Sequence, residues 1–272
     1  MKVEKAVDQV LGDYIFKDST GDLKKPKLFD IANLVLKHLP KGAKIVDFGS
    51  GYGDVPAVLS LLGYECVAID DFNDPWHTKE NIEKILSFSQ KYNIERISEI
   101  SSLESDFDMV MLHDVLEHLH DSPRDILSQL LSKTKDNGFL YATVPNAVNI
   151  RKRIAVIFGK TNLTPYNDYY WHPHPFRGHI REYVRGDFIK MAHWLDLEII
   201  ELRALNKMLL KLSPSIRKIW KFLSIFFPDC RDTWQFLGKK KKNWNPILNL
   251  DQENLKKYRK ESYRTVQDIE TS

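Results

Sequence analysis

The chain has 272 residues, of which 43% are hydrophobic and 28% are charged, a balance that can fill a globular core. This length suits one large α/β domain with insertions, or two small domains. The net charge of only +3 offers no general argument for nucleic-acid binding.

Targeting and membrane-spanning segments are not visible in the sequence. The chain starts Met-Lys-Val-Glu without an apolar segment, and no run approaches eighteen apolar residues. We therefore expect neither a signal peptide nor a transmembrane helix. Of the two cysteines, Cys66 falls in a predicted buried strand, so we expect no disulfide framework and a reducing, cytoplasmic location.

Helical and strand-like stretches alternate along most of the chain. Apolar residues at helical spacing predict helices at 26–39, 54–62, 79–91, 124–135, 182–195 and 207–227, the last broken at Pro214. Short apolar runs predict strands at 45–48, 66–69, 94–100, 107–112, 139–145, 197–205 and 232–237. This alternation predicts a doubly wound, mainly parallel sheet. Residues 146–178 interrupt it as an aromatic insertion rich in histidine and proline.

A glycine-rich turn joins the first predicted strand to the next helix. Residues 47–54 read D-F-G-S-G-Y-G-D. Glycine permits positive φ angles and lets the backbone approach a ligand closely, and a helix N-terminus supplies unpaired N–H donors. A plain strand-to-helix turn would account for the same pattern.

Two acids follow the second predicted strand. Asp70 and Asp71 stand about twenty residues after the turn, where a carboxylate can accept hydrogen bonds from both hydroxyls of a ribose. A nicotinamide dinucleotide and S-adenosylmethionine both fit this arrangement. Asp54 occupies the last glycine position of the dinucleotide motif, where it would repel a pyrophosphate but tolerate an amine and a sulfonium.

The pattern D-x-G-x-G-x-G that begins at Asp47 resembles motif I of the class I S-adenosylmethionine-dependent methyltransferases. The resemblance covers roughly residues 26–240. It implies a Rossmann-like sheet of seven strands with an antiparallel last strand, in one domain spanning 1–240. Residues 241–272 would then be a charged C-terminal extension.

By this resemblance we expect S-adenosylmethionine to lie at the carboxyl ends of the first, second and fourth strands. The chain has two serines, at 101 and 102, where relatives often have an acid after the third strand that contacts the adenine. We therefore expect Ser101 or Leu103 to take that place because of its position in the chain. The expected cofactor-binding residues are Asp47, Gly49, Ser50, Gly51, Gly53, Asp70, Asp71, Ser101, Leu103 and His113.

The segment after the fourth strand carries a second motif. Asp114, Glu117 and His118 would share one face if the backbone were helical, because residues three and four apart are neighbours. This D-x-x-E-H run, followed much later by His179, resembles two groups. They are the ubiquinone-biosynthesis O-methyltransferases and the small-RNA 3′-end 2′-O-methyltransferases.

Both groups hold a divalent metal with E-x-x-E-H and a later histidine, and the metal lowers the pKa of the acceptor hydroxyl. The resemblance implies the ligands Asp114, Glu117, His118 and His179, although aspartate is one methylene shorter than the family's glutamate. A metal-free alternative uses His118 or His179 as a general base oriented by Glu117. A purely structural role for the pair is a third interpretation.

Two apolar segments are candidates to cover the acceptor. The insertion at 146–178 could form a lid, or it could pack on its own domain as a surface loop. Apolar residues at 216–227 line one helical face with basic residues opposite. That helix could cover the acceptor, contact a membrane surface, or pack on the sheet.

We therefore predict methyl transfer from S-adenosylmethionine to an oxygen of a small-molecule or glycan-like acceptor. RNA 2′-O-methylation with a divalent metal is the alternative, although the nearly balanced charge argues against nucleic acid. A cofactor-binding protein without catalysis and a nicotinamide oxidoreductase are the other classes, the latter disfavoured by Asp54. The oligomeric state stays open.

Overall fold

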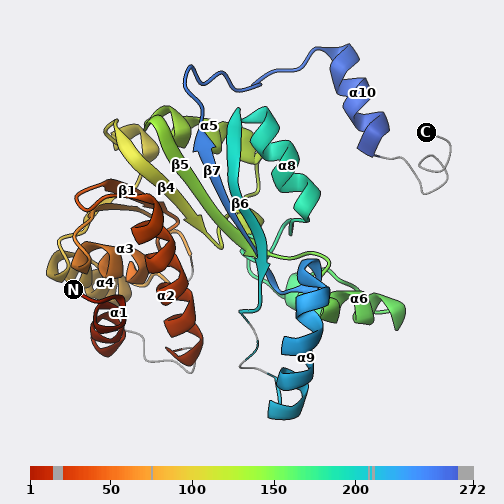
Figure 1. The fold of residues 1–272 in the computed structure, drawn as a ribbon, viewed down its shortest axis with the longest axis horizontal. Coiled ribbons are helices and arrows are strands. Elements are labelled where there is room, and N and C mark those ends of the chain that lie inside the picture. Colours follow the sequence, from red (N-terminus) through yellow and green to blue (C-terminus); the bar gives the residue numbers. More distant parts are fainter. Residues whose placement is uncertain (15–20, 75, 208, 210–211, 263–272) are drawn as a thin grey trace.

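The computed structural model describes the chain except for residues 15–20, 75, 208, 210–211 and 263–272. Seven strands form one sheet in the order β3-β2-β1-β4-β5-β7-β6 (Figure 1). Strands β1 to β5 pair in parallel, and β7 lies antiparallel between β5 and β6. The predicted doubly wound sheet with an antiparallel last strand is confirmed. The strands are β1 (Lys44–Phe48), β2 (Glu65–Ile69), β3 (Glu95–Ile97), β4 (Phe107–His113), β5 (Thr134–Pro145), β6 (Leu197–Leu205) and β7 (Thr233–Lys240).

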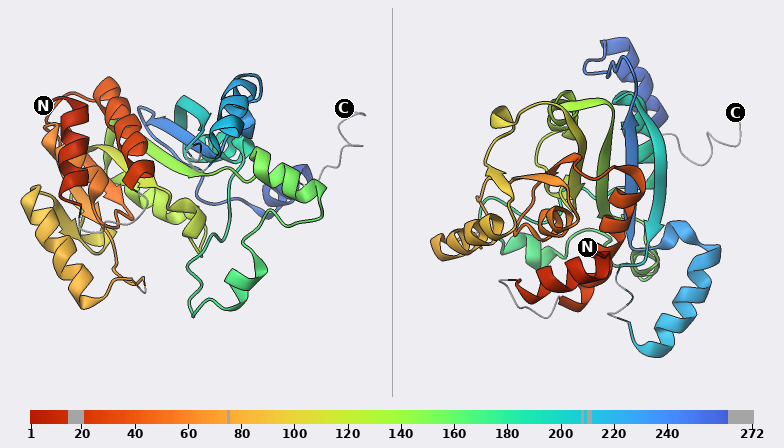
Figure 2. Two further views of the ribbon diagram at one scale, coloured as in Figure 1. Left: turned by 90° about the horizontal axis from the view of Figure 1, so that it is seen from below. Right: turned by 60° about the vertical axis from the view of Figure 1, so that its left-hand side comes forward.

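Helices connect these strands and flank both faces of the sheet (Figure 2). The α-helices are α1 (Val3–Gly12), α2 (Gly21–His38), α3 (Asp54–Leu61), α4 (Lys79–Lys91), α5 (Pro123–Ser132), α6 (Ile150–Ile157), α7 (Tyr166–Tyr170), α8 (Arg185–Trp194), α9 (Pro214–Phe226) and α10 (Gln252–Ser262). Short 3-10 turns include η1 (Ile100–Ser102), η2 (Leu116–His118) and η4 (Pro228–Cys230).

Several boundaries differ from the sequence-based expectation, such as β3, which is shorter than the predicted 94–100, and three of the differences have clear physical reasons. Helix α2 begins before Pro26 and contains it, since an internal proline removes one helical hydrogen bond without necessarily ending the helix. Helix α8 begins later than 182, where Asp187 accepts a hydrogen bond from the Val184 N–H at 3.0 Å. Asn137, expected in a turn before the fifth strand, lies inside β5 at φ +63°, next to an irregularity in the β4–β5 register.

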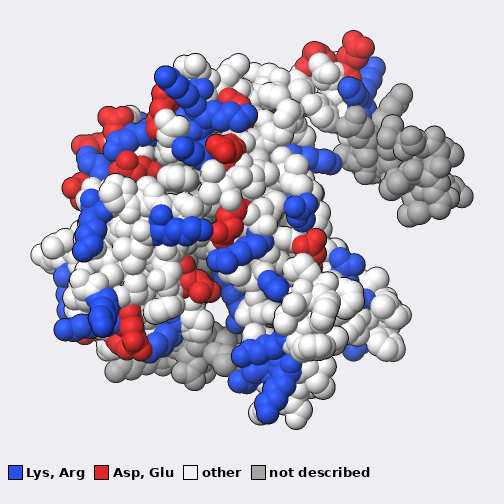
Figure 3. Space-filling model, in the orientation of Figure 1, with Lys and Arg blue, Asp and Glu red and all other residues white. Residues whose placement is uncertain are grey.

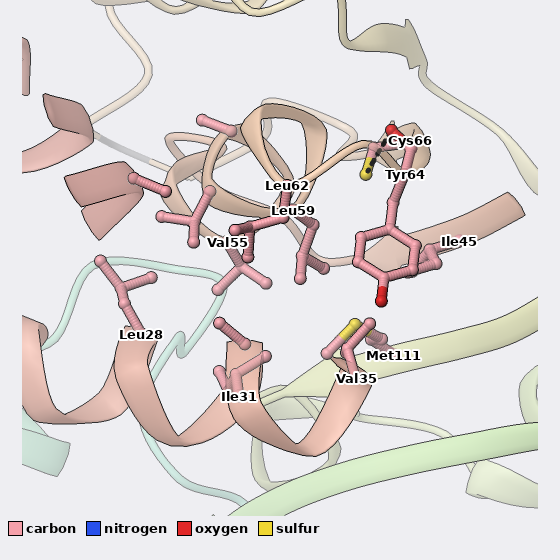
Figure 4. Packing of buried hydrophobic residues seen from close by; sticks show 14 of the residues in the cluster. Leu28, Ile31, Val35, Ile45, Val55, Leu59, Leu62, Tyr64, Cys66 and Met111 are labelled. Carbon is pink, nitrogen blue, oxygen red and sulfur yellow. Dashed lines mark hydrogen bonds between the residues drawn. The ribbon is translucent and has the colours of Figure 1, made fainter. Parts of the chain in front are cut away.

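Two hydrophobic clusters fill the space between the sheet and its helices. On one face, Leu28 and Ile31 of α2 lie close to Leu59 of α3 and Met111 of β4 (Figure 4). The cluster on the other face includes Phe188 of α8 and residues of α5, β5 and β7. The sheet is therefore buried on both sides, as a parallel sheet requires.

The insertion and α9 both leave the carboxyl edge of the sheet, after β5 and β6 respectively (Figure 1). The C-terminal extension runs back along α8, where the Trp244 Nε1–H donates to the Leu195 carbonyl at 2.6 Å. Among the described helices, none combines the length and the hydropathy needed to cross a bilayer.

Truncating Phe236 should destabilise the fold strongly. Its ring is fully buried in β7 and stacks on Phe188 with centroids 5.5 Å apart. Phe236→Ala should lower the free energy of unfolding by about 3–5 kcal/mol, measured by urea denaturation. Phe222→Ala on α9, where the side chain is exposed, serves as the control and should change it by about 0.5 kcal/mol or less. Equal losses in the two variants would contradict this description of the core.

Candidate active site

The glycine turn at the carboxyl end of β1 has a conformation that few other residues adopt. Gly49, Gly51 and Gly53 all have positive φ angles, of 69°, 51° and 86°. A Cβ built on Gly51 would meet no atom within 4 Å, so the turn opens onto free space at this residue. A Cβ on Gly49 would lie 2.5 Å from the Val115 side chain, so the packing of Val115 leaves room only for glycine at this position. The turn therefore presents bare backbone to a ligand.

Asp70 holds this turn from the end of β2. Its carboxylate accepts hydrogen bonds from the Gly51 N–H at 2.7 Å and from the Phe72 N–H at 3.1 Å. A carboxylate has about four acceptor positions, so two more hydrogen bonds, such as those of a ribose diol, can be accepted. Asp71 is exposed and accepts from the Asn73 N–H at 3.0 Å, further from the turn.

Arg96 of β3 is the residue at this turn that sequence reasoning missed. Its guanidinium donates to the Gly51 carbonyl at 3.1 Å and to the Ser50 hydroxyl at 3.2 Å. Burial lowers the pKa of Arg96, although Asp70 and Asp47 act to raise it. One arginine in a three-residue strand carries little signal in the sequence. A cation facing several acids becomes visible only once the strands are paired.

Asp47 lies inside β1 behind the turn and is almost completely buried. Burial raises the pKa of its carboxyl to about 7, and Asp54 adds repulsion in the same direction. Asp54 itself pairs with Lys24 of α2 at 3.2 Å. The acids of motif I thus sit in different environments, one inside the sheet and one at the start of α3.

The two residues expected after β3 lie in different places. Ser101 is exposed on η1 and donates to the Glu99 carboxylate at 3.0 Å. Leu103 is buried and lines a cavity of about 360 Å³ together with Lys44 and Glu65, the first residues of β1 and β2. Leu103 is therefore at the amino edge of the sheet, away from the glycine turn.

Glu117, His118 and His179 form what we call the Glu-His-His cluster. One ligand atom from each lies within 4.8 Å of the others, and the imidazole centroids are 4.9 Å apart. Glu117 is fully buried, and neither carboxylate oxygen has a hydrogen-bond partner among the described residues. Burial raises the pKa of Glu117 to about 8, and the charge of Asp114 contributes in the same direction.

The hydrogen bonds of the two imidazoles define which nitrogen is available. His118 Nδ1 lies 2.9 Å from the Arg177 carbonyl oxygen, which can only accept, so Nδ1 carries the proton. His179 Nδ1 lies 2.9 Å from Glu182, whose other oxygen pairs with Lys152. Burial and the nearby His118 lower the pKa of His179, which favours the neutral ring. Each ring thereby keeps Nε2 as a free lone pair.

Backbone contacts bring His179 to the cluster across some sixty residues of sequence. The N–H groups of Ile180 and Arg181 both donate to the carbonyl oxygen of Glu117, at 2.7 and 3.3 Å. Asn146, directly after β5, forms a β-bridge with Tyr183, which follows His179 in the same loop. The loop before α8 is therefore attached to both η2 and β5.

Asp114, the fourth expected ligand, lies outside the cluster. Its φ of +56° turns the chain at the end of β4, so the helical spacing assumed from the sequence is not formed. The carboxylate accepts from the Thr143 hydroxyl at 2.8 Å and pairs with Lys27 at 3.2 Å. Burial acts to raise the pKa of Asp114, but His113, Lys207 and Lys27 hold it well below its usual range.

His113, expected at the cofactor, has a largely buried ring whose Nδ1 lies 2.8 Å from the Thr143 hydroxyl. Since Thr143 already donates its proton to Asp114, its oxygen accepts from His113. Burial lowers the pKa of His113 well below its usual value. The neutral ring therefore belongs to the same network that engages Asp114.

The aromatic insertion ends beside the Glu-His-His cluster. Besides the Arg177 contact with His118, the Phe176 carbonyl lies 2.7 Å from His120 Nε2. Further out, α6 and α7 bury none of their side chains. The insertion is thus fixed at its base and largely exposed beyond it.

Comparison with protein families gives a match over most of this fold. Residues 23–202 match a family model described as a methyltransferase domain. The mitochondrial ubiquinone biosynthesis O-methyltransferase of Schizosaccharomyces pombe is 26% identical over 163 residues, covering 58% of this chain and 57% of that protein. The ubiquinone biosynthesis O-methyltransferase of Rickettsia prowazekii is 31% identical over 121 residues, covering 43% of this chain and 44% of that protein. The chain thus spans about half the length of the curated relatives it matches.

A solved structure extends the likeness to the arrangement of the elements. Coclaurine N-methyltransferase, bound to N-methylheliamine and SAH, superposes with a TM-score of 0.52 at 12% identity. The superposition covers 83% of this chain and 76% of that one. At this identity the likeness is one of fold.

Replacing Glu117 by glutamine should stabilise the metal-free protein, and more at pH 8 than at pH 5. The folded-state pKa of about 8 exceeds the ordinary 4.5, so between these values the folded state holds a proton that the unfolded chain has released. Raising the pH through this window therefore removes stability, with a slope of at most about 1.4 kcal/mol per pH unit. Glutamine is neutral at every pH in this window, so the variant does not lose this stability as the pH rises.

Urea unfolding of both proteins with EDTA at pH 5 to 8 measures the effect. Asp47, whose pKa is also raised into this range, is common to both proteins and cancels in the difference. A stability difference that does not change with pH would contradict the assignment of a buried, unpaired carboxyl to Glu117.

Proposed function

Because this chain belongs to the methyltransferase-domain family, we propose that it transfers a methyl group from S-adenosylmethionine to an oxygen of a small-molecule acceptor. The observation that carries the proposal is the juxtaposition at one sheet edge. An open glycine turn braced by Asp70 ends β1, and the Glu-His-His cluster follows β4, the neighbouring strand. The names of the curated relatives support oxygen as the accepting atom.

The residues at the turn fit S-adenosylmethionine. Gly51 leaves room for a ligand, and Asp70 has acceptor positions for a ribose diol. The carboxylate of Asp54 at the start of α3 suits a cofactor that carries an amine and a sulfonium. S-adenosylmethionine supplies an activated methyl group, so the protein's task is to position the acceptor and manage its proton.

The Glu-His-His cluster fits a divalent metal ion. Two neutral Nε2 atoms and a buried carboxylate are a common ligand set, and three protein ligands leave positions for acceptor oxygens. The two oxygens of Glu117 supply the specific argument, because they have no hydrogen-bond partner among the described residues and a dication would compensate the charge of this buried carboxylate. Such an ion lowers the pKa of a bound hydroxyl. Asp114 is not needed as a ligand in this arrangement.

The remaining groups would act on the acceptor. Glu182 and the Arg177 carbonyl orient the two imidazoles. If no metal binds, the Nε2 lone pair of His118, on the exposed side of the cluster, would accept the acceptor's proton. We propose that the base of the 146–178 insertion borders the acceptor, because its residues contact His118 and His120 directly.

Blocking the glycine turn should abolish cofactor binding. Gly51→Val would place a branched side chain in the open space before the turn, and titration calorimetry with S-adenosylhomocysteine should detect no binding. Gly42→Val is the matched control, since Gly42 has φ +81° and also has no neighbour within 4 Å, but it precedes β1 at the opposite edge. Retained affinity in Gly51→Val, or equal loss in the control, would overturn the assignment. NAD serves as the comparison ligand.

Removing either imidazole should separate catalysis from cofactor binding. His118→Ala and His179→Ala should each lower methyl transfer by about 10²-fold or more. Their affinity for S-adenosylhomocysteine should stay close to that of the wild type. Turnover is measured as transfer of labelled methyl to hydroxylated small molecules from a lysate. Wild-type turnover in both variants would leave the cluster a structural feature.

Metal binding is tested separately by calorimetry with Mn²⁺. We expect both histidine variants to lose Mn²⁺ affinity by about tenfold or more, whereas Asp114→Asn should retain it. If the wild type binds no Mn²⁺ and EDTA leaves turnover unchanged, the metal-free mechanism replaces the metal proposal.

A further inference from the structure

We propose that a cavity between α5, α8 and the C-terminal extension binds a long-chain fatty acid, with the carboxylate near the start of the two helices and the chain along α8. The cavity, which we call the α5–α8 cavity, has a volume of about 840 Å³. Small-molecule sites commonly enclose about 300–1,000 Å³ and are mostly apolar. The proposal goes beyond the proposed function, because the residues that line this cavity belong neither to the glycine turn nor to the Glu-His-His cluster.

Helices α5 and α8 give the cavity its length. Both begin at the carboxyl edge of the sheet and end at the amino edge, since they lead into β5 and β6, which run in the same direction. The α8 side of the cavity includes Asp187, Lys190, Met191 and Trp194. Their spacing of three and four residues places them on one side of the helix. Ten helical residues span about 15 Å, so an extended chain can lie along this side.

The end of the cavity at the amino edge is apolar. Trp194 and Leu195 lie there at the end of α8, and the extension adds Leu248, Leu250 and Leu255. An alkyl chain at this end would be shielded from water by α8 on one side and by the extension on the other, which favours binding.

The C-terminal extension covers this end. The Ile247 N–H donates to the Trp194 carbonyl at 2.7 Å, and the Tyr258 ring of α10 meets the Trp194 ring edge-on with centroids 5.9 Å apart. In the space-filling view the extension projects from the body of the molecule at the upper right (Figure 3). It lies outside residues 23–202, so the part of the chain that matches the family model does not form this cavity by itself.

The other end of the cavity is basic. Ser122 and Arg124, at the start of α5, and Arg181, in the loop before α8, line it, and Lys190 adds a third cation further along. Asp187 is the one acid among the described residues that line the cavity. The lining therefore changes from cationic to apolar along its length. This matches a ligand with an anionic head and a single hydrocarbon chain.

The two arginines keep hydrogen-bond donors for such a head. Arg181 pairs with Asp187 through one nitrogen at 3.3 Å, and Arg124 pairs with its neighbour Asp125 through Nε and Nη2. A guanidinium has five N–H donors in a planar arrangement that suits a carboxylate. With Lys190 included, three cations face two acids, and a bound carboxylate would compensate the remaining positive charge.

The cavity shares a wall with the loop that carries His179. Tyr183 lines the cavity, and its hydroxyl donates to the Leu116 carbonyl at 3.4 Å, directly before Glu117. The backbone N–H of Arg181 donates to the Glu117 carbonyl. A bound fatty acid would therefore contact the loop that holds the cluster without entering the proposed acceptor site.

The experiment is titration calorimetry of the purified full chain with dodecanoate, kept below its micellar concentration. One molecule should bind per chain, and saturation with S-adenosylhomocysteine should leave this affinity unchanged. Dodecanol has the same chain without the charge. It should bind at least about tenfold more weakly, because it lacks charge-assisted hydrogen bonds to the basic end.

Two variants separate the head from the chain. Lys190→Glu should weaken dodecanoate binding by about tenfold and leave dodecanol binding unchanged, because it reverses a charge at the head. Leu248→Asp should weaken both ligands, because it places a charge against the chain. Ile189→Asp is the matched control, since Ile189 is an exposed apolar residue of α8 that does not line the cavity, and it should bind both ligands like the wild type.

Unchanged S-adenosylhomocysteine affinity and thermal unfolding in these variants verify that the fold is intact. The proposal is overturned if the wild type does not bind dodecanoate, or if Lys190→Glu and Leu248→Asp bind it as tightly as the wild type does. Equal affinity of the wild type for dodecanol and dodecanoate would also overturn it, because the basic end would then recognise no head group. Displacement of dodecanoate by S-adenosylhomocysteine would place the chain in the active site instead.

Discussion

The carbonyl oxygen of Glu117 is the point on which the candidate site depends. Two backbone N–H groups from the loop before α8 converge on it, and they hold His179 beside Glu117 and His118. Backbone hydrogen bonds of this kind tolerate substitution of the residues that form them. The position of the cluster therefore follows largely from the parallel order of β4 and β5 and from the path of the chain, and side-chain contacts such as Glu182 with His179 orient the imidazoles.

The sequence alone was enough to predict the features that show a regular spacing of apolar residues or that require one particular residue type. The seven strands and their mainly parallel arrangement follow from the alternation of elements, the antiparallel last strand follows from the family resemblance, and the glycine turn follows from the need for positive φ at Gly51. Arg96 could not be found in this way. It acts through pairing of β3 with β2, a long-range contact that leaves no local pattern. Leu103 was placed by its distance from the strand end, although the chain had already returned to the amino edge.

Two other expectations depended on the assumption that local spacing implies local geometry. Asp114 stands three residues before Glu117, but a left-handed residue at that position separates their side chains. For α9, the periodicity correctly predicted an amphipathic helix, but the same pattern arises whether the apolar side meets a core or faces outward. The direction of that side is set by the polar contacts of Asn206 with Trp220 and Ser224, which no hydrophobic scale records.

Arg96 connects the glycine turn to β3, which is three residues long and forms the edge of the sheet. Edge strands are the first parts of a sheet to open, because they are paired on one side only. Any opening of β3 withdraws the guanidinium from Ser50 and Gly51, and a ligand that orders the turn opposes that opening. Occupancy of the turn is thereby coupled to the lifetime of β3. Slower amide hydrogen exchange at the sheet edge would be the signature of a filled site, although no atom of the ligand need touch that strand.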